Sequence, residues 1–130
     1  VRDNGIQLSA EAEEGMELQV DGNKIWSVLD NLVYNAIRHT PAGGSISLSI
    51  RRNGSQAELK VSDTGEGIAP EHLPHIFERF YKVSPERGEK DGSSGLGLYI
   101  VKTVVEAMGG TVEAESPPGN GTVFTIRFNE

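Results

Sequence analysis

The chain contains no cysteine among its 130 residues. Disulfide bonds and thiolate metal sites are therefore excluded, and the composition suits a reducing compartment. Long hydrophobic runs are also missing, since no apolar stretch approaches the roughly 18 residues that a membrane-spanning helix needs. The N-terminus has no signal-type pattern. The sequence therefore predicts that this chain neither crosses a membrane, nor is exported, nor contacts a membrane directly.

Positive charge is scarce as well. Lysine and arginine number 12 against 19 aspartates and glutamates, which gives a formal net charge of −7. This balance argues against a nucleic-acid binder that relies on the phosphate backbone, because such affinity comes mainly from clustered basic side chains. A nucleotide can still be bound through local backbone donors. The length is that of one domain with a real core, and the missing initiator methionine suggests a piece of a longer protein.

One apolar stripe at helical spacing organises the chain. It runs through Ile25, Val28, Leu29, Leu32, Val33, Ala36 and Ile37. Positions three and four apart lie on the same face of a helix, so this stripe predicts a helix that packs on the core.

A second, polar stripe lies about 100° round the same helix and is made by Asn31, Asn35 and Arg38, with His39 at its end. A single helix asparagine is ordinarily a surface residue. Two of them one turn apart need another reason, because asparagine is a poor former of helix interiors. We expect these side chains to line the rim of a cleft.

Alternating apolar residues predict strands on both sides of this helix, with their centres at 6–10, 16–20, 46–50, 57–61, 111–116 and 122–128. Asn53-Gly54 is typical of a hairpin turn, and Gly109-Gly110 should end a second amphipathic helix that includes residues 100–108. A short helix is expected from Pro70 to about Phe80, and a loop at 84–94. Because hairpins outnumber crossovers, we predict an α+β fold: a two-layer α/β sandwich with a mixed, mostly antiparallel sheet and helices on one face.

Two glycine-bearing stretches suit a nucleotide. In Asp63-Thr64-Gly65-Glu66-Gly67 a carboxylate follows a strand, and the glycines permit close approach of a flat ligand to the backbone. In Gly95-Leu96-Gly97-Leu98 the glycines lead into a helix N-terminus, where free N–H groups favour phosphate. Neither stretch is a Walker A loop or a dinucleotide fingerprint.

Taken together, the blocks resemble the catalytic ATP-binding domain of two-component sensor histidine kinases. They occur in that family's order and cover the chain from about Ile6 to Phe128. The five blocks are Asn31-x3-Asn35, Asp63-x-Gly65-x-Gly67, Ile76-Phe77-Glu78-Arg79-Phe80-Tyr81-Lys82, Gly95-x-Gly97 and Gly119-x-Gly121-Thr122. The resemblance implies a Bergerat-type (GHKL) fold over residues 1–130, with ATP and Mg²⁺ as cofactors.

The resemblance also implies roles at the phosphate end of the nucleotide. Asn35 would hold Mg²⁺ through its side-chain oxygen, and Asn31 would support the metal and phosphates. Arg38 would lie on the phosphates, and Lys82, where many members have arginine, would act near the γ-phosphate. These four residues form the implied catalytic set. Gly95 and Gly97 would cradle the phosphates beneath a lid made of residues 84–94.

At the base end, Asp63 would accept a hydrogen bond from the exocyclic amine of adenine, and Gly65 and Gly67 would let the ring lie against the backbone. Thr122 would sit near Asp63, and His39 would pack against the base where the family usually has tyrosine. The implied nucleotide site also includes Ile68, Leu96 and Leu98. His72 and His75 are expected to be neither metal ligands nor phosphoacceptors.

The implied activity is that of a protein histidine kinase of bacterial two-component signalling. Its partners would be the histidine-bearing dimerisation domain of the same parent protein and the receiver domain of a response regulator. The location would be cytoplasmic, whether or not the parent is anchored in the inner membrane. Asn31 argues against an ATPase that uses water, because such relatives carry a general-base glutamate there. A serine kinase of the anti-sigma type and a nucleotide-sensing module without transfer remain the alternatives.

Overall fold

The computed structural model describes residues 7–12, 22–79, 81, 97–117 and 121–129. The described elements are β1 (Gln7–Ala12), α1 (Gly22–His39), β2 (Ser45–Asn53), β3 (Gln56–Asp63), the 3₁₀ helix η2 (Leu73–His75), α3 (Gly97–Ala107), β4 (Thr111–Glu115) and β5 (Thr122–Asn129). The predicted strand at 16–20 and the predicted loop at 84–94 lie outside the described residues.

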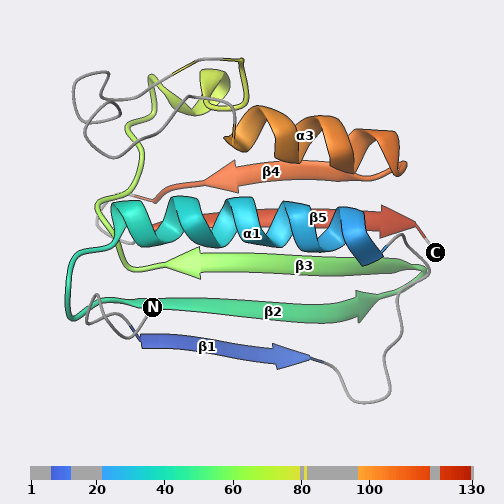
Figure 1. Cartoon of the computed structure of the whole chain (residues 1–130), viewed down its shortest axis with the longest axis horizontal. Helices are drawn as coiled ribbons and strands as arrows, with labels where there is room; N and C mark the ends of the chain where they lie inside the picture. The colour runs from blue at the N-terminus through green and yellow to red at the C-terminus, as the bar shows by residue number, and fades with distance from the viewer. Residues whose placement is uncertain (1–6, 13–21, 80, 82–96, 118–120, 130) are drawn as a thin grey trace.

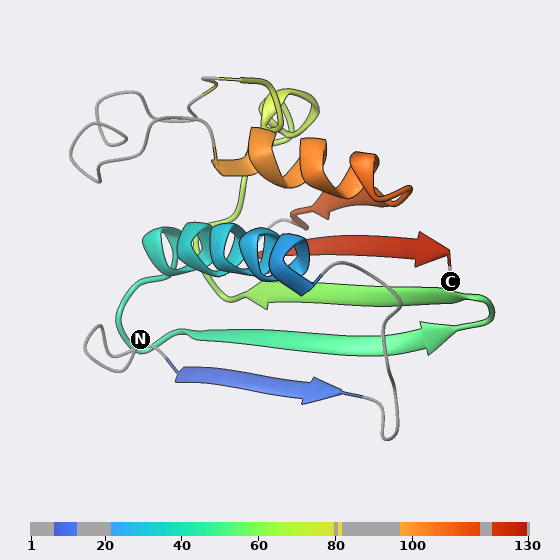
Figure 2. The ribbon, with the colours of Figure 1, turned by 45° about the vertical axis from the view of Figure 1, so that its right-hand side comes forward.

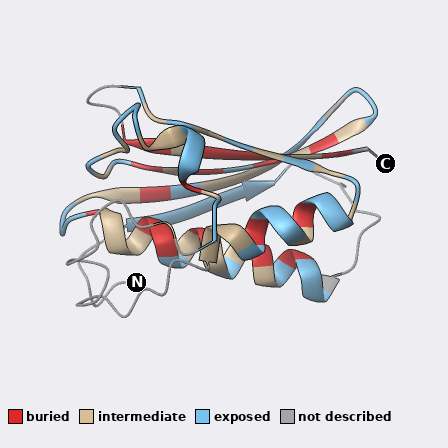
Figure 3. Cartoon of the chain, turned by 90° about the horizontal axis from the view of Figure 1, so that it is seen from above, coloured by how far each residue is buried: buried red, intermediate tan, exposed pale blue. Residues whose placement is uncertain are grey.

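The strands form one five-stranded sheet in the order β1-β2-β3-β5-β4 (Figure 1). β1 and β2 pair in parallel, and the other three pairings are antiparallel. Both α-helices cover the same face of this sheet, as Figures 2 and 3 show from two further directions. The predicted α+β sandwich with a mixed, mostly antiparallel sheet is confirmed.

α1 buries its apolar stripe between the sheet and α3. Ile25, Val28, Leu32 and Ala36 are all buried, at positions three and four apart. Trp26 and Tyr34 point away from this face and are largely exposed. The helix therefore folds as its periodicity predicts, with one edge left beside the core for polar side chains.

α3 ends in the glycine pair that the sequence indicated. Gly109 has a φ of +82°, a left-handed conformation that favours glycine. Its N–H donates to the Glu106 carbonyl, and the N–H of Gly110 donates to the Val105 carbonyl. This pair of bonds is a Schellman motif, which satisfies the last carbonyls of the helix and turns the chain into β4.

The two predicted hairpins are confirmed. Asn53 pairs with Gln56, so β2 and β3 are joined by a two-residue loop. β4 and β5 pair through Glu115 and Val123. Because β5 lies between β3 and β4, it carries core side chains along most of its length, including Phe124, Ile126 and Phe128.

The segment predicted as a helix from Pro70 to about Phe80 is described over residues 70–79, and these do not form an α-helix. Apart from the 3₁₀ helix η2, it is a run of turns whose backbone bonds link residues three apart, from Ala69 to Tyr81. Pro74 explains the difference, because it has no N–H to bond the carbonyl four residues before it and its ring clashes with that carbonyl. Ile76 and Phe77 still anchor this run on the core.

We predict that the α1 stripe is the main source of stability. Leu32→Ala should lower the free energy of unfolding by about 2–5 kcal/mol, because Leu32 is fully buried and truncation leaves a cavity. Leu8→Ala makes the same chemical change on β1, where the side chain is 42% exposed, and should cost about 1 kcal/mol or less. Urea unfolding measures both, and equal losses would contradict this packing.

Candidate functional site

The polar edge of α1 is the first part of the site. Asn35 is buried at 7% exposure, and Asn31, Arg38 and His39 are half-buried. All four follow the apolar stripe along one side of the helix. The structure therefore brings together the α1 residues that the sequence singled out.

Asn31 has a fixed orientation. Its Nδ2 donates to the carbonyl of Ser27 at 2.8 Å, one helical turn earlier. The side-chain oxygen, Oδ1, lies next to the first turn of α3, because a Cβ atom added to Gly97 would come within 3.3 Å of it. Gly97 thus lets α3 approach α1 closely, and Asn31 presents an acceptor oxygen at this junction.

Arg38 is tied to Asn35. Its Nη2 donates to Asn35 Oδ1 at 3.1 Å. Its Nε is buried and has no hydrogen-bond partner among the described residues. A buried donor without an acceptor is costly, so this atom marks a place where a ligand oxygen would be favourable.

Asp63 supplies the second part of the site from the end of β3. It is buried at 6% exposure and lies opposite Thr122 of β5, which is also buried. The N–H of Gly65 donates to Asp63 Oδ1 at 2.8 Å. Burial raises the pKa of Asp63 above its ordinary value of 3.8, against the opposing effects of the Gly65 N–H, nearby His39 and the Thr122 backbone.

The loop after β3 packs on the end of α1. The N–H of Glu66 donates to the His39 carbonyl at 3.3 Å, and Glu66 Oε1 lies 3.3 Å from His39 Nδ1. A Cβ atom on Gly65 would come within 2.2 Å of the His39 carbonyl oxygen. Only glycine fits that position, so the Asp63 loop and the polar edge of α1 are held against each other.

Ser116 holds the other side of this loop. Its hydroxyl accepts from the Ile68 N–H at 2.6 Å and donates to the Gly121 carbonyl at 2.8 Å. A Cβ atom on Gly67 would meet the same hydroxyl at 2.8 Å. Sequence reasoning missed Ser116, because a single serine after a strand carries no periodicity or motif of its own.

Gly121 brings the start of β5 close to Asp63. Its φ is +70°, and a Cβ atom there would come within 1.9 Å of the Asp63 carbonyl oxygen. A side chain at this position would therefore push Thr122 away from Asp63.

The remaining predicted residues divide into two groups. Ile68 and Leu98 pack against the hydrophobic core, so their predicted contact with a ligand stays a prediction. Lys82, Gly95 and Leu96 lie outside the described residues.

His72 and His75 have contacts within their own segment. His72 Nδ1 lies 2.5 Å from the Tyr81 hydroxyl, and His75 Nδ1 lies 2.7 Å from Glu78 Oε2. No group of three or more histidine, cysteine, aspartate or glutamate side chains that could hold a metal occurs in the described part of the chain. Within the same residues, no helix is both long and apolar enough to cross a membrane.

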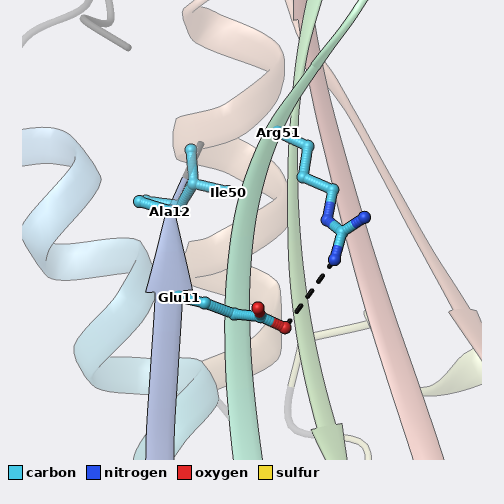
Figure 4. A pocket seen from close by; sticks show the side chains of 4 residues that line it. All are labelled: Glu11, Ala12, Ile50 and Arg51. Carbon is cyan, nitrogen blue, oxygen red and sulfur yellow. Dashed lines mark ion pairs between the residues drawn. The ribbon is translucent and has the colours of Figure 1, made fainter. Parts of the chain in front are cut away.

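A separate pocket lies farther along β1 and β2 (Figure 4), and none of the residues discussed above lines it. Its lining is Glu11, Ala12, Ile50 and Arg51. The Glu11–Arg51 ion pair across it spans 3.7 Å, with side chains that are 75% and 66% exposed. Such an exposed ion pair contributes about 0–1 kcal/mol to folding stability. Among the described residues, the pocket is lined by those of β1 and β2 alone, so we regard it as a local feature of this sheet edge.

Comparison with known proteins gives consistent matches. Residues 20–130 match the family described as histidine kinase-, DNA gyrase B-, and HSP90-like ATPase. The sensor protein DivL of Caulobacter vibrioides is 45% identical over 97% of this chain, and the sensor histidine kinase RppB of Synechocystis is 40% identical over 95%. The chain spans only 16% and 27% of the lengths of these two proteins.

Solved structures agree with the sequence matches. The catalytic domain of histidine kinase ThkA has a TM-score of 0.84 at 28% identity, over 98% of this chain and 81% of that one. Full-length ShkA, solved in complex with AMPPNP, has a TM-score of 0.83 at 29% identity, over 97% of this chain and 26% of that one.

The raised pKa of Asp63 predicts a pH dependence of stability. Between 3.8 and the raised value, the folded state binds more protons than the unfolded state, so the unfolding free energy should fall as pH rises through this window. Asp63→Asn removes the free-energy cost of ionising a buried carboxylate. The variant should therefore be more stable than the wild type at pH 7, with the gap narrowing as pH falls towards 4.

Urea unfolding across this pH range measures the gap. Asp30→Asn is the matched control, since it removes an exposed carboxylate from α1 and should change stability little. A wild type that gains stability over Asp63→Asn as pH rises would contradict the account.

Proposed function

The chain belongs to the family of histidine kinase-, DNA gyrase B- and HSP90-like ATPases, and we propose that it binds Mg²⁺-ATP and donates the γ-phosphoryl group to a histidine of an adjacent dimerisation domain. The proposal rests mainly on one observation. The loop after β3 holds a buried carboxylate, Asp63, against a polar helix edge whose Arg38 has a buried donor without a partner among the described residues.

Asp63 forms the part of the proposed site that would bind the adenine base. A buried carboxylate accepts a hydrogen bond strongly, and the exocyclic amine of adenine is a donor that fits it. The Gly65 N–H already bonds one carboxylate oxygen, which fixes the side chain before any ligand arrives. The glycines and Thr122 keep the surrounding backbone close to Asp63. A flat base would therefore contact the main chain rather than bulky side chains.

The polar edge of α1 forms the part of the proposed site that would bind the phosphates. Arg38 brings a buried Nε that has no acceptor in the described part of the chain, which suits a phosphate oxygen. Asn35 and Asn31 offer amide oxygens, and hard cations such as Mg²⁺ prefer oxygen ligands. When bound, Mg²⁺ would neutralise charge on the transferring phosphoryl group. The residues present therefore fit both ATP and the metal.

In this proposal the protein promotes transfer by positioning the reacting groups and by neutralising charge on the phosphates. Asn31 cannot act as a general base, because an amide does not accept a proton from water at neutral pH. Its Nδ2 is committed to Ser27, so its oxygen serves as an acceptor for the metal shell or bound water. This favours transfer to a positioned imidazole over hydrolysis.

The relatives support a proposal for the wider role. Both named sequence relatives are sensor proteins, and the ShkA structure holds AMPPNP, an analogue of ATP. We extend these features to this chain: a cytoplasmic catalytic domain of a sensor kinase whose phosphohistidine serves a response regulator receiver domain. Because this chain covers a small part of those relatives, the acceptor domain would be supplied by the rest of the parent protein.

Asp63 should dominate ATP affinity. Asp63→Ala removes a charge-assisted hydrogen bond in a closed site, which costs roughly 1.5–3 kcal/mol, so ATP should bind about 10- to 100-fold more weakly. Asp30→Ala, which truncates an exposed aspartate of α1, is the control and should bind as the wild type does. Calorimetric titration measures the ATP affinity of the wild type and both variants. Unchanged affinity in Asp63→Ala would show that Asp63 does not bind the adenine base.

Transfer should need a partner domain. The isolated chain should bind ATP yet take up no label from γ-labelled ATP, and adding the parent's histidine-bearing domain should produce an acid-labile, base-stable phosphoramidate on that domain. A partner with its histidine replaced is the control and should stay unlabelled. Strong labelling of the chain itself, or an acid-stable label on a serine of the partner, would instead support the serine kinase.

A further inference from the structure

Tyr34 is an exposed aromatic residue on α1 that no motif assigns to the site. It lies one helical turn before Arg38, and its side chain is on the solvent side of the helix, with the residue 53% exposed. An exposed tyrosine is common and needs no explanation. This one is distinguished by what lies over its ring, since the Arg38 Cζ is 5.2 Å from the ring centroid.

Arg38 is therefore held by two different contacts from its own helix. The polar contact is the bond from Nη2 to Asn35 Oδ1 at 3.1 Å. The aromatic contact is with the Tyr34 ring, whose face attracts the positive charge of the guanidinium. This attraction does not depend on Asn35, and the buried Nε of Arg38 has no hydrogen-bond partner among the described residues.

The polar contact conflicts with the proposed function. Asn35 Oδ1 is the same atom that would ligate Mg²⁺, and an oxygen bound to a dication is a poor acceptor for a second cation beside it. Binding of the metal and nucleotide should therefore weaken the bond to Asn35 and favour its release by Arg38. The aromatic contact has no such conflict, because it does not involve Asn35.

We propose that Tyr34 is a positioning residue that holds the Arg38 guanidinium on the phosphates after Arg38 has released Asn35. The inference rests on the proposed function and deepens it, since it concerns the phosphate end of the same site. Tyr34 itself touches neither the nucleotide nor the metal. It acts by restricting the arginine side chain, whose freedom would otherwise have to be lost on binding.

The effect should be confined to the phosphate end. A cation–π contact at a partly exposed site is equivalent to an affinity change of about two- to five-fold. Tyr34→Leu, which keeps bulk but removes the ring, should weaken Mg²⁺-ATP binding by that factor. Its affinity for adenosine, which lacks phosphates, should equal that of the wild type. Tyr34→Phe keeps the ring without the hydroxyl and should restore wild-type ATP affinity.

The experiment is calorimetric titration of wild type, Tyr34→Leu, Tyr34→Phe, Arg38→Ala and the Tyr34→Leu/Arg38→Ala double variant with adenosine and with Mg²⁺-ATP. We expect Tyr34→Leu to have no further effect once Arg38 is replaced, because the ring then has no cation to hold. Equal weakening of adenosine and ATP by Tyr34→Leu would show a merely structural role. Weak ATP binding by Tyr34→Phe would assign the effect to the hydroxyl, and either result overturns the proposal.

A second readout follows the arginine directly. The Arg38 Nε–H resonance should be shifted by the Tyr34 ring current in the wild type and in Tyr34→Phe, with and without Mg²⁺-ATP, and the shift should be absent in Tyr34→Leu. If the wild type binds neither adenosine nor ATP, the proposed function itself fails. If it binds both, and Arg38→Ala weakens ATP alone while Tyr34→Leu changes nothing, only the role of Tyr34 fails.

Discussion

The contact between the end of α1 and the loop after β3 is the constraint on which the site depends. The His39 carbonyl accepts the Glu66 N–H, and Gly65 lies so close to that carbonyl that a methyl group would not fit. This backbone contact joins a helix edge to a strand end that are more than twenty residues apart in the sequence. Without it, Asp63 and the asparagines of α1 would belong to separate surfaces.

The groups that form the site are held there at a cost in stability. Burial raises the pKa of Asp63, so the ionised carboxylate destabilises the folded chain near neutral pH. Arg38 keeps a buried donor without an acceptor among the described residues. Such costs are typical of functional sites, where a ligand supplies the missing partners. The apolar stripe of α1 and the inner face of the sheet provide the stability that offsets them.

The features predicted correctly from the sequence are those set by local patterns. The α1 stripe, the Asn53-Gly54 hairpin and the glycine stop after α3 each follow from residues close together in the chain. The helix predicted from Pro70 to about Phe80 is wrong over the described residues 70–79, because Pro70 at a first-turn position suggested a helix while Pro74 prevents one. Ser116 and the Tyr34–Arg38 contact could not be predicted, since the first depends on distant backbone and the second on side-chain positions that periodicity does not specify. The roles carried by the family resemblance remain predictions.

Nuclear magnetic resonance can show whether Asp63 and the polar edge of α1 form one nucleotide site. Mg²⁺-ATP would be titrated into the labelled chain while the Gly65 backbone amide, beside Asp63, and the Asn35 side-chain amide are followed together. If Asp63 and the α1 edge form one site, both signals should move with a single dissociation constant, and adenosine should move the Gly65 signal far more than the Asn35 signal. Two different dissociation constants, or a response of Asn35 without Gly65, would contradict a single site.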